Sequence, residues 1–193
     1  MRKKVIGTIG KNASGKDTVV DILCRKLGVR CISMGDIVRE IARAKGVDPT
    51  RKNLNEVSRS HFEKHGPDFF IRKVIERIDE SDVPFAVISG IRTYVDARAL
   101  RDRYDSDFLL IHVVVSDDAV RLGRAVQRAT ARDPRSIEEL KRDDEREEKI
   151  FGLQAAAGLA TMKIANDGTL EQLENKVDLW VEENLPELRA REA

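Results

Sequence analysis

The sequence predicts an α/β fold, with a five-stranded parallel sheet covered by helices. Short apolar runs of strand length alternate along the chain with longer segments in which apolar residues recur every three or four positions. A glycine-containing loop, residues 10–18, joins the first apolar run directly to the first helical segment. A chain of 193 residues can bury one substantial core, so we expect a single domain over residues 1–193.

Five apolar runs are the predicted strands. They lie at residues 5–9 (VIGTI), 29–32 (VRCI), 85–88 (FAVI), 108–115 (FLLIHVVV) and 162–165 (MKIA). A segment of helical period follows each of them, which is the order expected when neighbouring strands run parallel.

Pairs of residues at capping-box spacing mark the expected helix starts. These pairs are Ser14 with Asp17, Ser33 with Asp36, Thr93 with Asp96, Ser136 with Glu139, and Thr169 with Gln172. The last helix places Leu170, Leu173, Val177 and Trp180 on one face, as expected for a helix packed on a sheet, so we expect this tryptophan in the core.

The segment 42–82 is too long for one crossover between strands. It reads as two or three helices that are interrupted near Asp48-Pro49 and at Gly66-Pro67. We therefore expect a helical insertion at this point of the fold.

A second departure from the strand–helix repeat is the segment 121–158. It contains the run EELKRDDEREEK at 138–149, with eleven charged residues in twelve positions. We expect a solvated helix, compatible with a mobile lid, because buried charges are costly. Four-residue spacing predicts ion pairs along it, such as Glu138 with Arg142 and Glu145 with Lys149.

The composition excludes several classes of function. The chain has 35 basic and 34 acidic residues and a net charge of +1, which argues against non-specific binding of nucleic acid. No stretch approaches the ~18 apolar residues of a membrane helix, and the N-terminus lacks the apolar region of a signal peptide. We expect a cytoplasmic protein that has no membrane partner and is a monomer or small homo-oligomer.

Cysteine and histidine residues predict no metal centre. Cys24 and Cys31 are too few for a disulfide framework or a structural zinc site, and each is expected to be a small buried hydrophobe. His61, His65 and His112 do not form a metal-binding constellation, and His112 lies inside a predicted strand.

The loop GKNASGKDT has the spacing of a phosphate-binding loop, Gly-x-x-x-x-Gly-Lys. Its backbone amides can turn inward around a phosphate, the following helix adds partial positive charge, and Lys16 can reach the terminal phosphates. The predicted nucleotide-binding residues are Gly10, Lys11, Asn12, Ala13, Ser14, Gly15, Lys16, Asp17 and Thr18.

These residues resemble those of adenylate-kinase-like nucleoside monophosphate kinases, whose loop commonly ends in Gly-Lys, a spacer residue and Thr. The resemblance implies that Thr18 helps to hold Mg²⁺ and phosphate, while Asp17 faces outward. It also implies the P-loop nucleoside triphosphate hydrolase fold of the nucleoside monophosphate kinases, with a helical acceptor-binding insertion (42–82) and a lid region (121–158).

Two further stretches resemble the acceptor site of that family. ISMGDIVRE (32–40) matches Ser-x-Gly-Asp-x-x-Arg, which implies that Gly35, Asp36 and Arg39 bind the acceptor and that Arg39 grips its phosphate. ISGIRT (88–93) looks like the family's Asp-Gly-Phe-Pro-Arg-Thr, which implies a second acceptor-binding arginine at Arg92.

Lid and base-binding stretches complete the resemblance. RLGRAVQRATARD (121–133) looks like a lid in which Arg124, Arg128 and Arg132 neutralise the donor phosphates. NDGTLEQL (166–173) is similar to the family's stretch after the last strand, which implies that Asn166 lies beside the donor base.

The resemblance implies ATP-dependent phosphoryl transfer, with Mg²⁺, to a nucleoside monophosphate or a similar small phosphorylated acceptor. Lys16, Asp36, Arg128 and Arg132 are then the candidate catalytic residues. One alternative is a dephospho-CoA-kinase-like transfer to a ribose hydroxyl, with Asp36 as the base. Another is a regulatory protein that binds ATP without transferring phosphate, since Ser89 stands where the family usually has a magnesium-holding aspartate.

Overall fold

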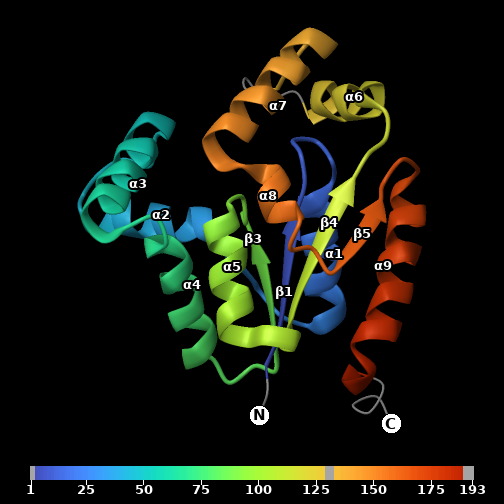
Figure 1. Cartoon of the computed structure of the whole chain (residues 1–193), viewed down its shortest axis with the longest axis horizontal. Helices are drawn as coiled ribbons and strands as arrows, with labels where there is room; N and C mark the ends of the chain where they lie inside the picture. Colours follow the sequence, from blue (N-terminus) through green and yellow to red (C-terminus); the bar gives the residue numbers. More distant parts are fainter. Residues whose placement is uncertain (1–2, 129–132, 189–193) are drawn as a thin grey trace.

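The structure is a computed structural model that describes residues 3–128 and 133–188 (Figure 1). Five parallel strands form one sheet in the order β2-β3-β1-β4-β5. They are β1 (Lys4–Ile9), β2 (Cys31–Ser33), β3 (Phe85–Ser89), β4 (Phe108–Val114) and β5 (Met162–Ala165). The predicted α/β fold is confirmed.

The strand predictions hold to within one residue at each end, except at β2. That strand was expected at 29–32 but begins at Cys31. The chain needs residues 28–30 to reverse direction after the first helix, since Gly28 takes a left-handed conformation (φ 63°) and the Val29 amide donates to the Cys24 carbonyl at 3.1 Å.

Helices cover both faces of the sheet (Figure 1). Apolar side chains of α1 (Lys16–Leu27) and α9 (Leu170–Asn184) pack on one face, and Trp180 is buried among them, as predicted. The prediction is wrong for Leu170, which is 58% exposed because it is the first residue of α9, one turn before the buried Leu173. The other face carries α4 (Phe69–Glu80), α5 (Tyr94–Tyr104) and the short α8 (Leu153–Ala157). The two apolar clusters form the core on either side of the sheet.

Three of the five predicted capping residues cap their helices by a side-chain hydrogen bond. Thr93 and Thr169 form complete capping boxes, and the Ser136 hydroxyl accepts from the Glu139 amide at 3.2 Å. Ser33 is the N-cap of α2 (Met34–Ala44) without such a bond. The prediction for Ser14 is wrong, because α1 begins at Lys16 with Gly15 as its N-cap.

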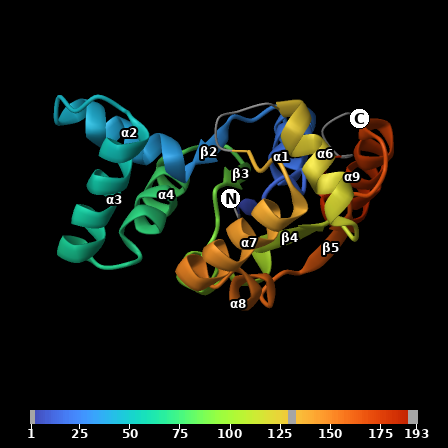
Figure 2. The same cartoon turned by 90° about the horizontal axis from the view of Figure 1, so that it is seen from above.

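Two further groups of helices extend from the sheet, one beside β2 and one over the carboxyl ends of the strands. In Figures 1 and 2, α2, α3 (Arg51–His65) and α4 form a group at the β2 side, and the predicted breaks near Pro49 and Pro67 fall between them. Helices α6 (Asp118–Arg128) and α7 (Ile137–Phe151) lie over the carboxyl ends of the strands. Short 3₁₀ turns occupy Asp105–Asp107 and Pro186–Leu188.

None of the described helices combines the length and the apolar composition that a membrane span needs. The cytoplasmic location and the oligomeric state expected from the sequence stay predictions.

Candidate functional site

Two glycines determine the path of the loop between β1 and α1. A Cβ at Gly10 would lie 2.5 Å from the Val113 carbonyl oxygen, so a larger residue would push the loop away from β4. Gly15 has φ 89°, and a Cβ on it would lie 2.2 Å from the Asn166 side-chain nitrogen. That amide donates to the Ser14 carbonyl at 2.8 Å, which ties the loop to the chain after β5.

The start of α1 leaves its first backbone amides available to a ligand. Gly15 provides no side-chain cap, and Ser14, only 1% exposed, has no hydrogen-bond partner for its hydroxyl among the described residues. Free amides at a helix N-terminus, together with the helix dipole, favour a bound anion. This is the local geometry that a phosphate loop requires.

A cavity of about 560 Å³ opens at this helix start. It gathers residues from the loop, from α1, from α6 and from the turn before α9. Of the predicted nucleotide-binding residues, the ones that line it are Ala13, Gly15, Lys16, Asp17, Thr18, Arg124, Arg128 and Asn166. Burial lowers the pKa of Lys16 from its ordinary value, as expected for an ammonium placed where a bound phosphate would supply its counter-charge.

Two arginines of α6 line this cavity and contact different parts of the chain. Arg124 donates to the Gly168 carbonyl at 3.2 Å and to the Asn166 side-chain oxygen at 3.4 Å. Arg128 donates to the Asn12 side-chain oxygen at 3.2 Å and pairs with the Asp133 carboxylate. Arg132, the third predicted lid arginine, lies outside the described residues.

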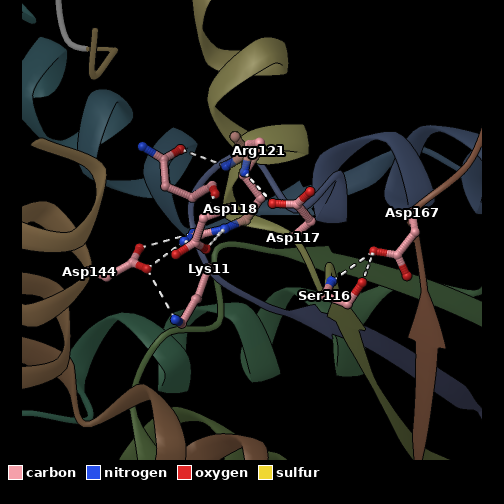
Figure 3. Close-up of polar contacts among 10 residues, drawn as sticks. Lys11, Ser116, Asp117, Asp118, Arg121, Asp144 and Asp167 are labelled. Atoms are coloured by element: carbon pink, nitrogen blue, oxygen red, sulfur yellow. Dashed lines mark hydrogen bonds and ion pairs between the residues drawn. The ribbon is translucent and has the colours of Figure 1, made fainter. Parts of the chain in front are cut away.

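A further arginine, Arg121 of α6, links this helix to α7 and to the loop by hydrogen bonds and ion pairs (Figure 3). It is 1% exposed and donates to the Asn12 carbonyl at 3.2 Å. The same guanidinium reaches Asp118 of α6 at 2.6 Å and Asp144 of α7 at 2.6 Å. Lys11 of the loop also contacts Asp144, at 3.1 Å. One buried cation and one carboxylate thus join three elements.

The role of Arg121 and Asp144 was missed by the sequence analysis, which treated the run 138–149 as a solvated face. That prediction is wrong for one side of α7, where Leu140 is fully buried and the Asp144 side chain is only 11% exposed. The available signal was that Asp144 lies four residues after Leu140, the run's single apolar residue, and therefore shares a helix face with it. The ion pair found within this helix joins Asp143 to Arg146 rather than either of the two pairs expected.

The residues at the loop fit a magnesium ion that is held chiefly by phosphate. Among the described residues no group of three His, Cys, Asp or Glu side chains could ligate a metal. Mg²⁺ binds commonly through substrate phosphates, water and one or two protein oxygens. Thr18, which the sequence predicts as the magnesium residue, lines the cavity together with Lys16, Asp17 and Asp21.

The predicted acceptor residues lie at the neighbouring strand ends. Ser33 of β2 pairs in register with Ser89 of β3, so the chain leaves both strands at one edge of the sheet. A Cβ at Gly90 would lie 3.5 Å from the Met34 Cβ, which shows how closely the corner after β3 approaches α2. The corner that carries Arg92 and the helix that carries Arg39 therefore begin side by side.

Both acceptor-side arginines are engaged by carboxylates. Arg39 donates to the Asp36 carboxylate at 3.1 Å and 2.5 Å and folds back over Gly35. The Arg92 guanidinium lies 4.0 Å from Glu147 of α7 and 5.4 Å from the centre of the Phe151 ring. These cations are partly exposed and could exchange their present partners for a phosphate.

Comparison with known proteins places the chain among relatives of similar sequence. A family described as AAA domain matches residues 9–141. A UPF0200/UPF0201 protein of Archaeoglobus fulgidus is 35% identical over 179 residues, which cover 92% of this chain and 54% of that relative. A UPF0200 protein of Methanoculleus marisnigri is 34% identical, over 88% of this chain and 90% of its own length. The chain thus spans about half of the first relative and most of the second.

Solved structures share the fold at low sequence identity. Shikimate kinase from Acinetobacter baumannii, in complex with shikimate, aligns with a TM-score of 0.54 at 18% identity and 95% coverage of both chains. A gluconokinase from Sinorhizobium meliloti aligns with a TM-score of 0.59 at 14% identity, over 100% of this chain and 99% of its own. At these identities the likeness shows a P-loop kinase fold.

Proposed function

We propose that this chain, which belongs to the UPF0200 proteins and to the AAA-domain family of P-loop kinase class, transfers the terminal phosphoryl group of ATP. The acceptor that we propose is a nucleoside monophosphate or a similar small phosphorylated molecule. The solved structures that share the fold, a shikimate kinase and a gluconokinase by name, make a small-molecule acceptor reasonable.

The donor cavity is the observation that carries this proposal. Lys16, Thr18, Arg124, Arg128 and Asn166 come from three distant parts of the chain and line one space of about 560 Å³. Phosphoryl transfer asks the protein chiefly for positioning and for compensation of charge on the phosphates. A lysine and two arginines around a free helix N-terminus provide both.

Each group has a distinct task in the proposed reaction. The amides of the loop and Lys16 hold the phosphates of ATP, and Thr18 provides an oxygen to Mg²⁺, which supplies charge neutralisation when bound. Arg128, from α6, adds positive charge to the lining of the cavity. Arg124 and Asn166 form the wall on which the base of the nucleotide packs.

The acceptor would be held between α2 and the corner after β3. Its phosphate takes the place of Asp36 on Arg39 and of Glu147 on Arg92. Helices α6 and α7 act in this proposal as the lid, because Arg92 joins the end of α7 to the acceptor side.

The donor assignment is tested by the variant Lys16→Ala. We expect the affinity for ATP, measured by calorimetry, to fall by about 100-fold or more, since a desolvated charge pair with phosphate is lost. Lys26→Ala is the matched control, because Lys26 lies on the same helix and pairs with Asp178 instead. Unchanged affinity in Lys16→Ala would contradict the loop assignment.

A screen of acceptors tests the reaction itself. ADP release from magnesium-ATP is followed with ribo- and deoxynucleoside monophosphates and with dephospho-CoA. The proposal expects one preferred nucleoside monophosphate. If dephospho-CoA alone stimulated ADP release, the acceptor would instead be a ribose hydroxyl of that molecule, with Asp36 as the base. ATP binding without stimulation by any acceptor would support a regulatory protein.

A further inference from the structure

The two cysteines of the chain lie together, although the sequence analysis treated them as separate buried hydrophobes. Cys24 is on α1 and Cys31 is the first residue of β2. Both are free and half-buried, and their side chains are hydrogen-bonded to each other. Both pack against the core as expected, but neither is fully buried.

The turn after α1 brings the thiols together. Gly28 has φ 63°, and its amide donates to the Arg25 carbonyl at 3.4 Å. The Val29 amide donates to the carbonyl of Cys24 itself at 3.1 Å. These two bonds reverse the chain at the end of the helix, so that Cys31 returns along the side of α1. Both cysteines then pack against the same apolar cluster.

The surroundings of the two thiols make them unequal. The hydrogen bond from Cys24 lowers the pKa of Cys31 to about 7, and hydrogen bonds from Ser89 act in the same direction. The same contact raises the pKa of Cys24. A thiolate is the reactive form of cysteine, so Cys31 is the nucleophile of the pair and Cys24 keeps its proton.

We propose that Cys24 and Cys31 are a modification site, an oxidisable thiol pair that hydrogen peroxide converts to an intramolecular disulfide. The Cys31 sulfur attacks one peroxide oxygen, the O–O bond breaks, and hydroxide leaves to form Cys31 sulfenic acid. The Cys24 sulfur then attacks the Cys31 sulfur, an S–S bond forms, the S–O bond breaks, and the hydroxide departs as water with the Cys24 proton. Two thiols and one peroxide give one disulfide and two waters.

The position of the two cysteines means that a disulfide would connect two elements of the proposed sites. Helix α1 carries Lys16 and Thr18 at its start, and β2 leads directly into α2, which carries Arg39. A bond between Cys24 and Cys31 would tie the helix of the donor site to the strand that enters the acceptor side. The chemistry of the pair does not depend on the reaction proposed above.

Peptide mapping of the folded, full-length chain tests the proposal. The reduced protein is treated with hydrogen peroxide, free thiols are then blocked with N-ethylmaleimide in denaturant, and the chain is digested with trypsin without reductant. Arg25, Lys26 and Arg30 lie between the cysteines, so the two thiols fall on separate peptides unless a disulfide joins them. We expect the linked pair 17–25 with 31–39, at about 2 Da below the sum of the two peptides.

Two serine variants test the assignment of roles. In Cys24→Ser, oxidation should stop at Cys31 sulfenic acid, which dimedone traps. Cys31→Ser should react with peroxide at least about tenfold more slowly than Cys24→Ser. The proposal is overturned if treated wild-type protein keeps two alkylated cysteines or forms disulfide-linked dimers. Equal rates for the two variants, with circular dichroism showing both folded, would overturn the role of Cys31.

Discussion

The two regions that we propose as the donor side and the acceptor side are organised in different ways. On the proposed donor side, backbone constraints and buried polar contacts hold the groups in place: the Asn166 amide donates to the Ser14 carbonyl, and Arg121 is bonded to the loop and to α7. On the acceptor side, Arg39 and Arg92 are partly exposed, and each faces a carboxylate of the chain itself. The proposed donor side is thus held by contacts within the chain, whereas on the proposed acceptor side a ligand would have to replace existing ion pairs.

This difference has an energetic meaning. A buried, fully bonded network resists change because removing one member leaves other charges without compensation. Exposed ion pairs are worth about 0–1 kcal/mol and break readily. Mutations on the donor side should therefore affect both stability and ATP binding, and mutations on the acceptor side should affect mainly the acceptor.

The largest loss of stability is expected from Arg121→Met, which removes the buried guanidinium that links α6, α7 and the loop. The substitution leaves Asp118 and Asp144 without their buried partner, so the free energy of unfolding should fall by about 3–5 kcal/mol. Urea denaturation followed by circular dichroism measures it. Arg146→Met is the control, since Arg146 is exposed on α7 and pairs only at the surface with Asp143. If both variants lost the same stability, Arg121 would not be the link that we describe.

An intermediate effect, on the KM for the acceptor, is expected from Glu147→Gln, which removes the carboxylate that faces Arg92. Removing this charge frees Arg92 for the acceptor phosphate, so the KM for the acceptor should fall by up to about fivefold while that for ATP stays unchanged. Steady-state kinetics measures both constants. Glu145→Gln, an exposed neighbour on the same helix, is the control. A KM for the acceptor that stays constant or rises would contradict the competition between Glu147 and phosphate.

The smallest effect is expected in the pH dependence of stability, through Asp96 at the corner that carries Arg92. Its buried carboxylate accepts from the Thr93 amide at 3.1 Å, and burial raises its pKa above the ordinary 3.8. The folded state then holds this proton more tightly than the unfolded state, so the free energy of unfolding falls as pH rises from 3.8 through the folded pKa.

Asp96→Asn should remove that slope, because asparagine can still accept the amide hydrogen bonds but does not titrate. Chemical denaturation from about pH 3.5 to about pH 6.5 measures it in both proteins. An identical pH dependence in wild type and variant would show that Asp96 does not titrate differently in the folded state.

The sequence predicts the donor side better than the acceptor side for a physical reason. Residues 10–18 form one continuous stretch whose spacing and place after a strand are visible without any tertiary information. Arg39 pairs locally with Asp36 of the same helix, but the partners of Arg92 depend on where α7 lies. Glu147 and Phe151 are more than fifty residues from Arg92 in the chain. Tertiary contacts of this kind have no local signal.

Two errors of the sequence analysis have the same origin. Asp144 looked like one more solvated charge until α7 was placed against the loop, where Arg121 and Lys11 surround it. The thiol pair was hidden because residues 28–30 form a turn rather than the start of a strand. A charged or polar residue that becomes buried through a tertiary contact cannot be recognised from composition alone.

The central claim is that ATP and the acceptor are bound by separate sets of residues, and Arg39→Ala tests it most directly. Steady-state kinetics with the preferred acceptor should show its KM raised by about 10- to 100-fold, with the KM for ATP within about twofold of wild type. Arg43→Ala, an exposed arginine one turn further along α2, should change neither constant. Equal increases in the two KM values for Arg39→Ala would contradict the separation of donor and acceptor sides.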